Sequence, residues 1–381
     1  MIPLAIPNLA GNERQYLNEC IDSTFVSTVG PFVTRFERLV SQASGYAHTV
    51  ATSAGTTGLH AALIAVGVKP GDLVIIPGLT FIATANAVAH AHAQPWLIDI
   101  DNKSWTLDPK KLAHELETAT KPDVNGMPIH LESGRNVSAI VPVYTLGMPA
   151  DMDLIVATAR KYRIPVVADA AAALGATYND RQLGDIGADL CMFSFNGNKT
   201  VTAGGGGAVS GNDKSLVDLV RHLTTTARVG DEYDHDRVGF NYRLTNLQAA
   251  VGCAQLEQLE AFVAKKRWIS NYYSDAFRDL PQVESFPVST FAKSACWFSG
   301  ILLKSDNSSN FRRALRNAGI DARPFWKPIN LQIPFSEVPH GDLTESNSVW
   351  QRIVTLPCST SITNDQLLSV VEAVRRELAL I

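Results

Sequence analysis

Short apolar runs rich in β-branched residues alternate with longer segments of helical periodicity between about residues 50 and 210. This alternation predicts an α/β fold with a mostly parallel central sheet and helices on both of its faces. The polar segment 121–136 contains Gly and Pro and is predicted to be a surface insertion. The expected strands are residues 49–51, 73–77, 96–100, 139–143, 165–169 and 190–194. The expected helices between them are residues 57–66, 81–90 and 152–162.

The pattern changes after residue 246. A long helical pattern covers residues 247–278, and it is followed by a predicted strand at 297–303 and an amphipathic helix at 364–380. We therefore predict a large α/β domain at residues 1–246, which includes the N-terminal segment. A smaller C-terminal α+β domain is expected at residues 247–381.

Composition narrows the possible partners. The 381 residues are enough for two domains. A formal net charge of −4 and a pI near 6.1 argue against a nucleic-acid partner or a polybasic membrane contact. Five scattered cysteines without a CxxC pair predict reduced thiols and no metal site. We find no signal-peptide pattern and no apolar run of about 18 residues, so we expect a cytoplasmic protein without a membrane partner.

Several polar residues follow the predicted strands, and ligands of parallel sheets bind beyond the carboxyl ends of the strands. Lys199 comes shortly after the strand at 190–194 and precedes the glycine run 204–207. A buried lysine has a lowered pKa and can attack an aldehyde, whereas a solvated surface lysine is the plainer alternative. The glycine run lacks the GK[ST] ending of a phosphate-binding P-loop, so we interpret it as closely packed backbone. We expect segments 77–81, 144–149 and 194–199 to face one crevice together with Asp169.

Three further positions fit the binding of a flat, phosphorylated cofactor. Asp169 ends a strand, where its carboxylate suits the pyridine nitrogen of pyridoxal 5′-phosphate (PLP) or caps a helix. The turn 54–58 opens a predicted helix, where backbone N–H groups suit a phosphate, although a simple capping turn has the same pattern. Phe81 could stack on a planar cofactor or could belong to the core.

Taken together, several segments resemble the DegT-type nucleotide-sugar aminotransferases, which are fold-type-I PLP enzymes. The resemblance extends from residues 2–4 to residues 356–357, nearly the whole chain. The opening residues and the segment 194–199 look closest to the legionaminic-acid-pathway branch, which aminates C4 of a UDP-linked 4-keto-6-deoxy sugar. The segments that carry the resemblance are 53–57, 77–84, 147–153, Asp169, 194–200 and 239–250.

The resemblance implies a role for each matching residue. Lys199 would bind PLP covalently as a Schiff base, Asp169 would pair with the protonated pyridine nitrogen, and Phe81 would stack on the ring. Asn241 would reach the cofactor phosphate from the other subunit of a homodimer with a shared active site. The remaining cofactor-binding residues would be Gly55, Thr56, Thr57, Ser194 and Asn198.

The substrate end of the site is expected in the C-terminal part of the chain. Residues 321–328 resemble the family segment near the nucleotide-sugar, and Arg323 and Trp326 lie within it. Arg243 is a further candidate, because an arginine suits a diphosphate. An arginine on a surface helix would look the same in the sequence.

Three positions depart from the family pattern. Ala172 stands where the family usually has Gln, His or Glu, and Met148 and Tyr144 replace histidines that are common in the family. These changes leave room for another PLP reaction on a sugar nucleotide, such as dehydration or epimerisation. Relatives that dehydrate replace the lysine by histidine, so the retained Lys199 favours transamination. A non-catalytic regulatory protein on the same fold is a second alternative. Such a protein would be marked in the sequence by loss of the lysine, and this chain retains it.

The resemblance therefore implies a ping-pong transaminase. L-Glutamate would donate its amino group to the cofactor, and a nucleotide-linked keto-sugar would then receive it. The released amine of Lys199 would act as general base and acid in both half-reactions. Such a reaction belongs to amino-sugar or cell-surface polysaccharide biosynthesis.

Overall fold

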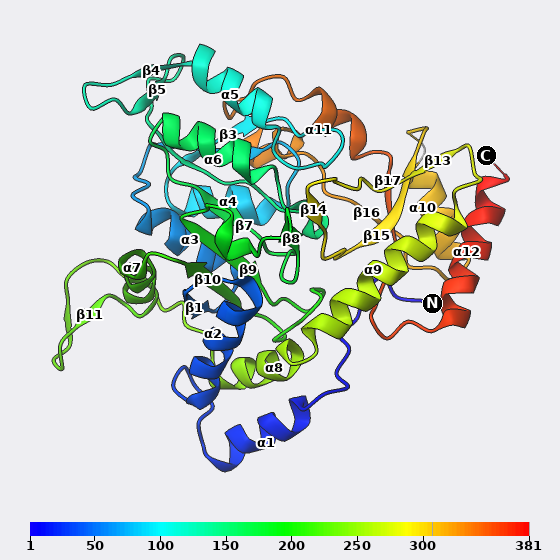
Figure 1. Ribbon diagram of the computed structural model, residues 1–381, viewed down its shortest axis with the longest axis horizontal. Helices are drawn as coiled ribbons and strands as arrows, with labels where there is room; N and C mark the ends of the chain where they lie inside the picture. The colour runs from blue at the N-terminus through cyan, green and yellow to red at the C-terminus, as the bar shows by residue number, and fades with distance from the viewer. Residues whose placement is uncertain (307, 381) are drawn as a thin grey trace.

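A twisted sheet forms the centre of the computed structural model, which describes residues 1–306 and 308–380 (Figure 1). Strand β10 runs antiparallel to both of its neighbours, and the other neighbouring pairs are parallel. Parallel bridges between Ile140 and Val166 and between Val143 and Asp169 join the two halves of the sheet. The predicted mostly parallel α/β fold is thus confirmed. The strand order is β3 (Gln94–Ile98), β2 (Leu73–Pro77), β6 (Val137–Ile140), β7 (Val167–Asp169), β9 (Leu190–Ser194), β10 (Gly207–Gly211) and β1 (His48–Thr52).

Helices cover both faces of this sheet because its strands are apolar on both sides. In β2, Leu73 and Ile75 belong to one hydrophobic cluster, whereas Val74 and Ile76 belong to another. Alternate residues of a strand point to opposite faces, so a continuous apolar strand needs a cover on each. The first cluster is covered by α1 (Glu13–Asp22), α2 (Pro31–Ser44), α5 (Pro109–Thr118), α6 (Met152–Lys161) and α8 (Asn246–Leu256). The second is covered by α3 (Gly55–Ala65), α4 (Ile82–His90) and α7 (Lys214–Thr224).

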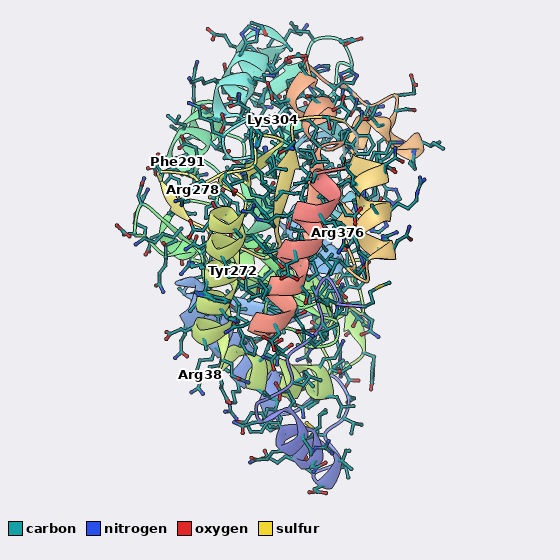
Figure 2. All side chains as sticks on the ribbon, turned by 90° about the vertical axis from the view of Figure 1, so that its right-hand side faces the viewer. Arg38, Tyr272, Arg278, Phe291, Lys304 and Arg376 are labelled. Atoms are coloured by element: carbon teal, nitrogen blue, oxygen red, sulfur yellow. The ribbon has the colours of Figure 1, made fainter. Side chains whose placement is uncertain are left out.

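The C-terminal part forms a separate antiparallel sheet with its own hydrophobic cluster. Figure 2 views this part from outside, with α9 (Leu259–Ala276) and α12 (Asn364–Leu378) on its surface. Tyr272 lies on α9, Arg376 lies on α12, and Arg278 follows the end of α9. The N-terminal segment joins this part, because the backbone N–H of Ile2 donates to Gly319 O at 2.8 Å. The strand order is β13 (Val283–Ser285), β15 (Ser299–Leu303), β17 (Ile353–Leu356) and β16 (Arg323–Pro324). The helices around it are α9 (Leu259–Ala276), α10 (Ser308–Asn317) and α12 (Asn364–Leu378).

The structure differs from the sequence-based expectations in a few places. The helical pattern at 247–278 is two helices, α8 and α9, separated at Glu257 and Gln258. Side chains of α8 pack into the first cluster of the large sheet, and Ile269 and Tyr273 of α9 pack into the C-terminal cluster. The domain boundary after residue 246 remains a prediction. The segment 121–136 carries most of a short hairpin of β4 (Thr120–Pro122) and β5 (Pro128–His130), with exposed residues around its tip.

Short elements complete the described chain. The paired short strands are β4 (Thr120–Pro122) with β5 (Pro128–His130), β8 (Thr177–Tyr178) with β14 (Ala292–Lys293), and β11 (Arg228–Val229) with β12 (Asp234–His235). The short helices are α11 (Thr344–Val349), η1 (Thr145–Gly147), η2 (Leu183–Asp185), η3 (Ile329–Leu331) and η4 (Ile333–Phe335).

Candidate active site

A cavity of about 480 Å³ lies between the carboxyl ends of the central strands and the C-terminal part of the chain. Strand β7 contributes Asp169 and β9 contributes Ser194, while Lys199 comes from the loop that joins β9 to β10. This is the position at which an open parallel sheet binds its ligands. Nine of the predicted site residues line this cavity: Gly55, Thr56, Phe81, Asp169, Ser194, Asn198, Lys199, Arg323 and Trp326.

The amine of Lys199 lies in surroundings that favour its neutral form. Burial of the side chain lowers the pKa of this amine to about 8, while the negative charge of Asp169 acts in the opposite direction. The Nζ atom lies 3.7 Å from the ring centroid of Trp297. A lysine with a pKa near 8 is partly neutral at physiological pH, so it can attack an aldehyde and can accept a proton.

The carboxylate of Asp169 is buried at the end of β7 and is 6% exposed. Thr84 Oγ1 donates a hydrogen bond to Asp169 Oδ2 at 2.7 Å, and the backbone N–H of Ala171 donates to Oδ1 at 3.1 Å. Burial raises the pKa of Asp169, and these two hydrogen bonds together with the charge of Lys199 oppose that rise. A buried carboxylate held in this way suits a cationic partner such as a protonated ring nitrogen.

The first turn of α3 forms a cradle beside Ser194. A Cβ atom added to Gly55 would lie 3.1 Å from Ser194 Cβ and 3.0 Å from Met192 Sδ, so a side chain here would fill the cradle. Gly207 packs against the same turn, because an added Cβ would lie 2.6 Å from Gly55 N. Of the glycine run that we interpreted as closely packed backbone, Gly206 and Gly207 are buried and closely packed, whereas Gly204 is exposed with open space around it. The helix N-terminus can bind a phosphate, Lys199 can react with an aldehyde, and Asp169 can pair with a ring nitrogen. The cavity therefore fits PLP, which has all three groups.

Aromatic side chains and one arginine form the opposite wall. The ring of Phe81 is 54% exposed, and its centroid lies 6.1 Å from that of Trp326. Trp326 in turn stacks on Phe325 at 4.4 Å. Arg323 Nη2 donates to Asp321 Oδ2 at 2.9 Å, which fixes the guanidinium at the rim of the cavity. This wall can hold a planar ring and an anionic group.

Three predicted residues are not among those that line the cavity in the described chain. The hydroxyl of Thr57 turns back and donates to Ala54 O at 2.9 Å, as a helix cap. Asn241 is exposed, and Arg243 pairs through its backbone with Thr52. Their roles in binding cofactor or substrate stay predictions.

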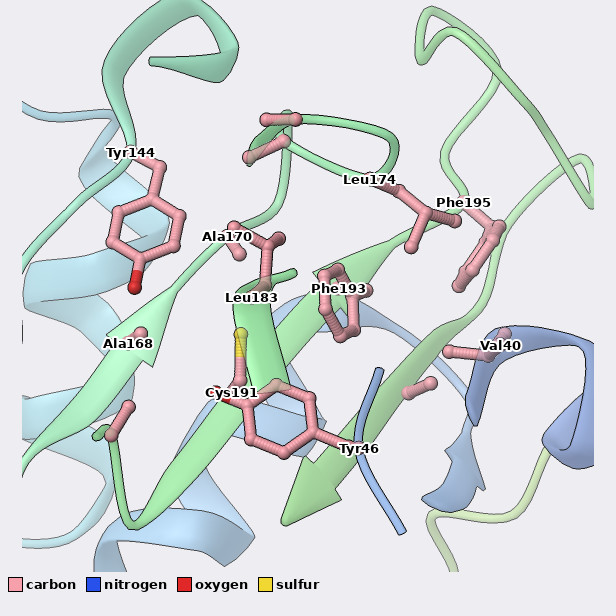
Figure 3. Close-up of a cluster of buried hydrophobic side chains, with 14 of the residues drawn as sticks. Val40, Tyr46, Tyr144, Ala168, Ala170, Leu174, Leu183, Cys191, Phe193 and Phe195 are labelled. Carbon is pink, nitrogen blue, oxygen red and sulfur yellow. The ribbon is translucent and has the colours of Figure 1, made fainter. Parts of the chain in front are cut away.

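The three residues that depart from the family pattern lie in different places. Ala172 lines the cavity, whereas Met148 lines a neighbouring cavity. Tyr144 also lines the first cavity, but its ring belongs to the buried cluster drawn in Figure 3. The hydroxyl of Tyr144 has no hydrogen-bond partner among the described residues, and burial raises its pKa well above the ordinary value.

Two residues of the site were not predicted from the sequence. Thr84 lies one helical turn after Thr80, and the two hydroxyl oxygens are 2.9 Å apart. An i, i+4 pair of threonines at the start of a helix was the available signal. Trp297 was assigned only to the start of a strand, and nothing in its local sequence marks it as a neighbour of Lys199.

Residues 1–306 and 308–380 contain neither a membrane-spanning helix nor a cluster of metal ligands. No helix there is both long and apolar enough to cross a membrane. No group of three or more His, Cys, Asp or Glu side chains within those residues could hold a metal ion.

Comparison with known proteins identifies the family. The family model of the DegT/DnrJ/EryC1/StrS aminotransferases matches residues 7–375. The chain is 34% identical over 375 residues to the GDP-perosamine synthase of Escherichia coli O157:H7, covering 98% of this chain and 97% of that protein. It is 35% identical over 387 residues to the GDP-perosamine synthase of Caulobacter vibrioides, with 99% and 98% covered.

The solved structure of DesV from S. venezuelae in complex with a ketimine intermediate has the same fold. The TM-score is 0.86 at 27% sequence identity, over 96% of this chain and 94% of DesV. The family match over nearly the whole length agrees with a cavity that is lined by a lysine of lowered pKa and a buried aspartate. The chain belongs to the DegT/DnrJ/EryC1/StrS aminotransferase family and is a PLP-dependent sugar aminotransferase.

Proposed function

We propose that this protein transfers an amino group from L-glutamate to a keto-sugar linked to a nucleoside diphosphate. The observation that carries this proposal is the cavity in which Lys199 and Asp169 face a wall with Arg323 and Trp326. The first pair suits the cofactor, and the second pair suits an anionic, ring-containing substrate. The names of the two perosamine synthases, which describe a GDP-linked amino sugar, support the substrate class.

The nucleotide has two candidates. The amino-acid sequence of residues 194–199 favours a UDP-linked 4-keto-6-deoxy sugar, whereas the names of the two relatives favour a GDP-linked sugar. The sugar ring would be recognised in the same cavity in either case. Both nucleotides therefore belong in the test.

The residues of the cavity would share the chemistry as follows. PLP, when bound, supplies an electron-withdrawing ring that stabilises negative charge on the carbon next to the amino group. Lys199 would move one proton in each half-reaction, from the α-carbon of the amino donor to the cofactor in the first and from the cofactor to the former keto carbon of the sugar in the second, which its lowered pKa permits. Asp169 would hold the ring nitrogen protonated, with Thr84 and the N–H of Ala171 keeping the carboxylate in place. Ser194 and the N-terminus of α3 would bind the phosphate.

Spectroscopy of the two half-reactions tests this function. Holoenzyme mixed with L-glutamate is expected to lose the absorbance of the pyridoxal form and gain that of the pyridoxamine form. UDP- and GDP-linked 4-keto-6-deoxy sugars are then added separately, and one of them is expected to restore the first spectrum and give an amino sugar of the corresponding mass. Failure of the glutamate step contradicts transamination from glutamate and favours dehydration or epimerisation. Failure of every keto-sugar after a successful first step contradicts the substrate class.

We also propose a homodimer in which Asn241 binds the cofactor phosphate of the partner subunit. Asn241 is exposed on its own chain and pairs through its backbone with Thr225, beside the β11–β12 hairpin. This hairpin projects from the body of the molecule, and Tyr233 at 83% and Val238 at 85% exposure lie on or next to it (Figure 1). An arm of this kind can reach a second copy of the chain.

Replacement of Asn241 tests the shared site. Asn241→Ala is expected to weaken PLP binding about tenfold or more, because a hydrogen bond to a charged group is lost. Asn102→Ala, at an exposed turn, is the matched control and is expected to bind PLP normally. Sedimentation of the wild-type holoenzyme is expected to give a dimer. An active monomer, or an unchanged affinity for PLP in Asn241→Ala, would remove this assignment.

A further inference from the structure

Trp297 connects the C-terminal part of the chain to the loop that carries Lys199. Its side chain is nearly buried, at 4% exposure. The indole Nε1–H donates a hydrogen bond to the backbone oxygen of Asn198 at 2.7 Å. The face of the same ring lies 3.7 Å from Lys199 Nζ, measured to the ring centroid. One side chain therefore contacts both the backbone just before Lys199 and the amine of Lys199.

Other contacts hold Trp297 itself in place. Its backbone N–H donates to Leu146 O at 2.9 Å, and its backbone oxygen accepts a hydrogen bond from Lys266 Nζ at 2.8 Å. Lys266 is only 3% exposed, so this contact is made inside the protein. The ring also stacks on Phe298, with 4.0 Å between the centroids and 20° between the planes. Since its backbone and ring are both fixed, Trp297 can act as a rigid support.

We propose that Trp297 is a positioning residue for Lys199. Its indole N–H fixes the loop that carries Lys199, and the face of its ring holds the amine of Lys199 whenever that amine is not bonded to the cofactor. Lys199 must leave the cofactor in each half-reaction and must then stay close to the atoms between which it moves a proton. An amine on four flexible carbons loses that position easily unless something holds it. The face of an aromatic ring attracts an ammonium group and still lets the neutral amine move away.

The charged groups around Lys199 allow this effect to be measured. The titratable side chains that line the cavity in the described chain are Tyr144, Asp169, Lys199 and Arg323. Asp169 favours the charged form of the amine, and burial disfavours it. The ring of Trp297 acts in the same direction as Asp169, because its π face is negative. Removal of the ring is therefore expected to lower the pKa of Lys199 further.

Two substitutions separate the two contacts, and a third serves as control. Trp297→Phe retains a ring face but removes the indole N–H, whereas Trp297→Leu removes both. Trp268→Leu is the matched control, because Lys265 Nζ lies 3.9 Å from the ring centroid of Trp268 at a solvent-exposed part of α9. The control thus removes the same type of pair at residues that do not line the cavity.

The first measurement is the pH dependence of Lys199 labelling. The full-length, cofactor-free chain is treated with trinitrobenzenesulfonate between pH 6 and 10, and the peptide that contains Lys199 is quantified by mass spectrometry. In the wild type the labelling rate is expected to be half-maximal near pH 8. Trp297→Leu is expected to lower this midpoint by about half a unit to one unit, because the charged amine loses its aromatic partner. Trp297→Phe and Trp268→Leu are expected to keep the wild-type midpoint.

The second measurement is hydrogen exchange in the lysine loop. Residues 196–200 are expected to exchange about fivefold faster in Trp297→Phe, because one hydrogen bond to the loop is lost. The kcat of the holoenzyme is expected to fall by a similar factor, with little change in KM. An unchanged midpoint in Trp297→Leu together with unchanged exchange in Trp297→Phe would overturn the proposal. If Trp297→Leu does not fold, unchanged exchange in Trp297→Phe alone overturns it.

The inference rests on the proposed role of Lys199, and its test separates the two claims. Labelling and hydrogen exchange need neither glutamate nor a sugar, so an incorrect substrate assignment leaves their results unchanged. A failure of the proposed role of Lys199 would instead appear in the wild-type holoenzyme, as PLP bonded to another lysine.

Discussion

Lys199→Ala is expected to lose the visible absorbance of the bound cofactor and at least about 10³-fold in turnover. The substitution removes both the covalent attachment of PLP and the amine that moves the proton in each half-reaction. The cavity itself would remain, because Asp169 and the N-terminus of α3 are held by contacts that do not involve Lys199. Absorbance spectra and the rate of the glutamate half-reaction measure the two losses separately.

Lys266→Met is the control for this variant. Lys266 is also a buried lysine, but its amine donates to the backbone of Trp297 and it does not line the cavity. It is expected to retain the absorbance of the bound cofactor. A normal spectrum in Lys199→Ala combined with a lost spectrum in Lys266→Met would show that the cofactor is bonded to Lys266 and not to Lys199.

Asp169→Asn is expected to bind PLP but to lose turnover by about 10²- to 10³-fold. The amide keeps the shape of the side chain, but it lacks the negative charge that keeps the ring nitrogen protonated. The negative charge of Asp169 also raises the pKa of Lys199, so this substitution is expected to lower that pKa. Steady-state kinetics and the pH dependence of Lys199 labelling measure the two effects.

The matched control for Asp169→Asn is Asp279→Asn. Asp279 is paired with Arg375 at the surface of the C-terminal part, and its replacement is expected to leave turnover within about twofold, as for an exposed ion pair. Equal rates for Asp169→Asn and Asp279→Asn would contradict the role of Asp169.

The strands that the sequence predicts best are those with continuous apolar runs. The runs at Leu73–Pro77 and Leu190–Ser194 match β2 and β9 because both are buried on both faces. Strand β10, Gly207–Gly211, was not predicted, because its Gly-Ala-Val-Ser-Gly sequence has low strand propensity. It is a strand because it lies between β9 and β1, and that neighbourhood is a property of the whole sheet. The break between α8 and α9 falls at Glu257 and Gln258, where the sequence has no Gly or Pro signal.

The site was predictable where it depends on strand ends. Asp169 and Lys199 both lie at or just after the carboxyl ends of apolar strands, and ligands of parallel sheets bind beyond those ends, so the two residues are expected to lie together. The contacts that refine the site join distant parts of the chain, as in Thr84 with Asp169 at a separation of 85 residues. Trp297 and Asn198 are 99 residues apart. Nothing in the local pattern at 84 or 297 encodes such a contact, because it depends on how the sheet and the C-terminal part are arranged.

The position of the covalent bond to PLP tests the central claim most directly. The holoenzyme is reduced with borohydride, digested with a protease, and analysed by mass spectrometry for a peptide that carries the mass of the reduced cofactor. That mass is expected on the lysine of the peptide that contains Lys199. Finding it on Lys266 or on any other lysine, or on no lysine at all, would contradict the account.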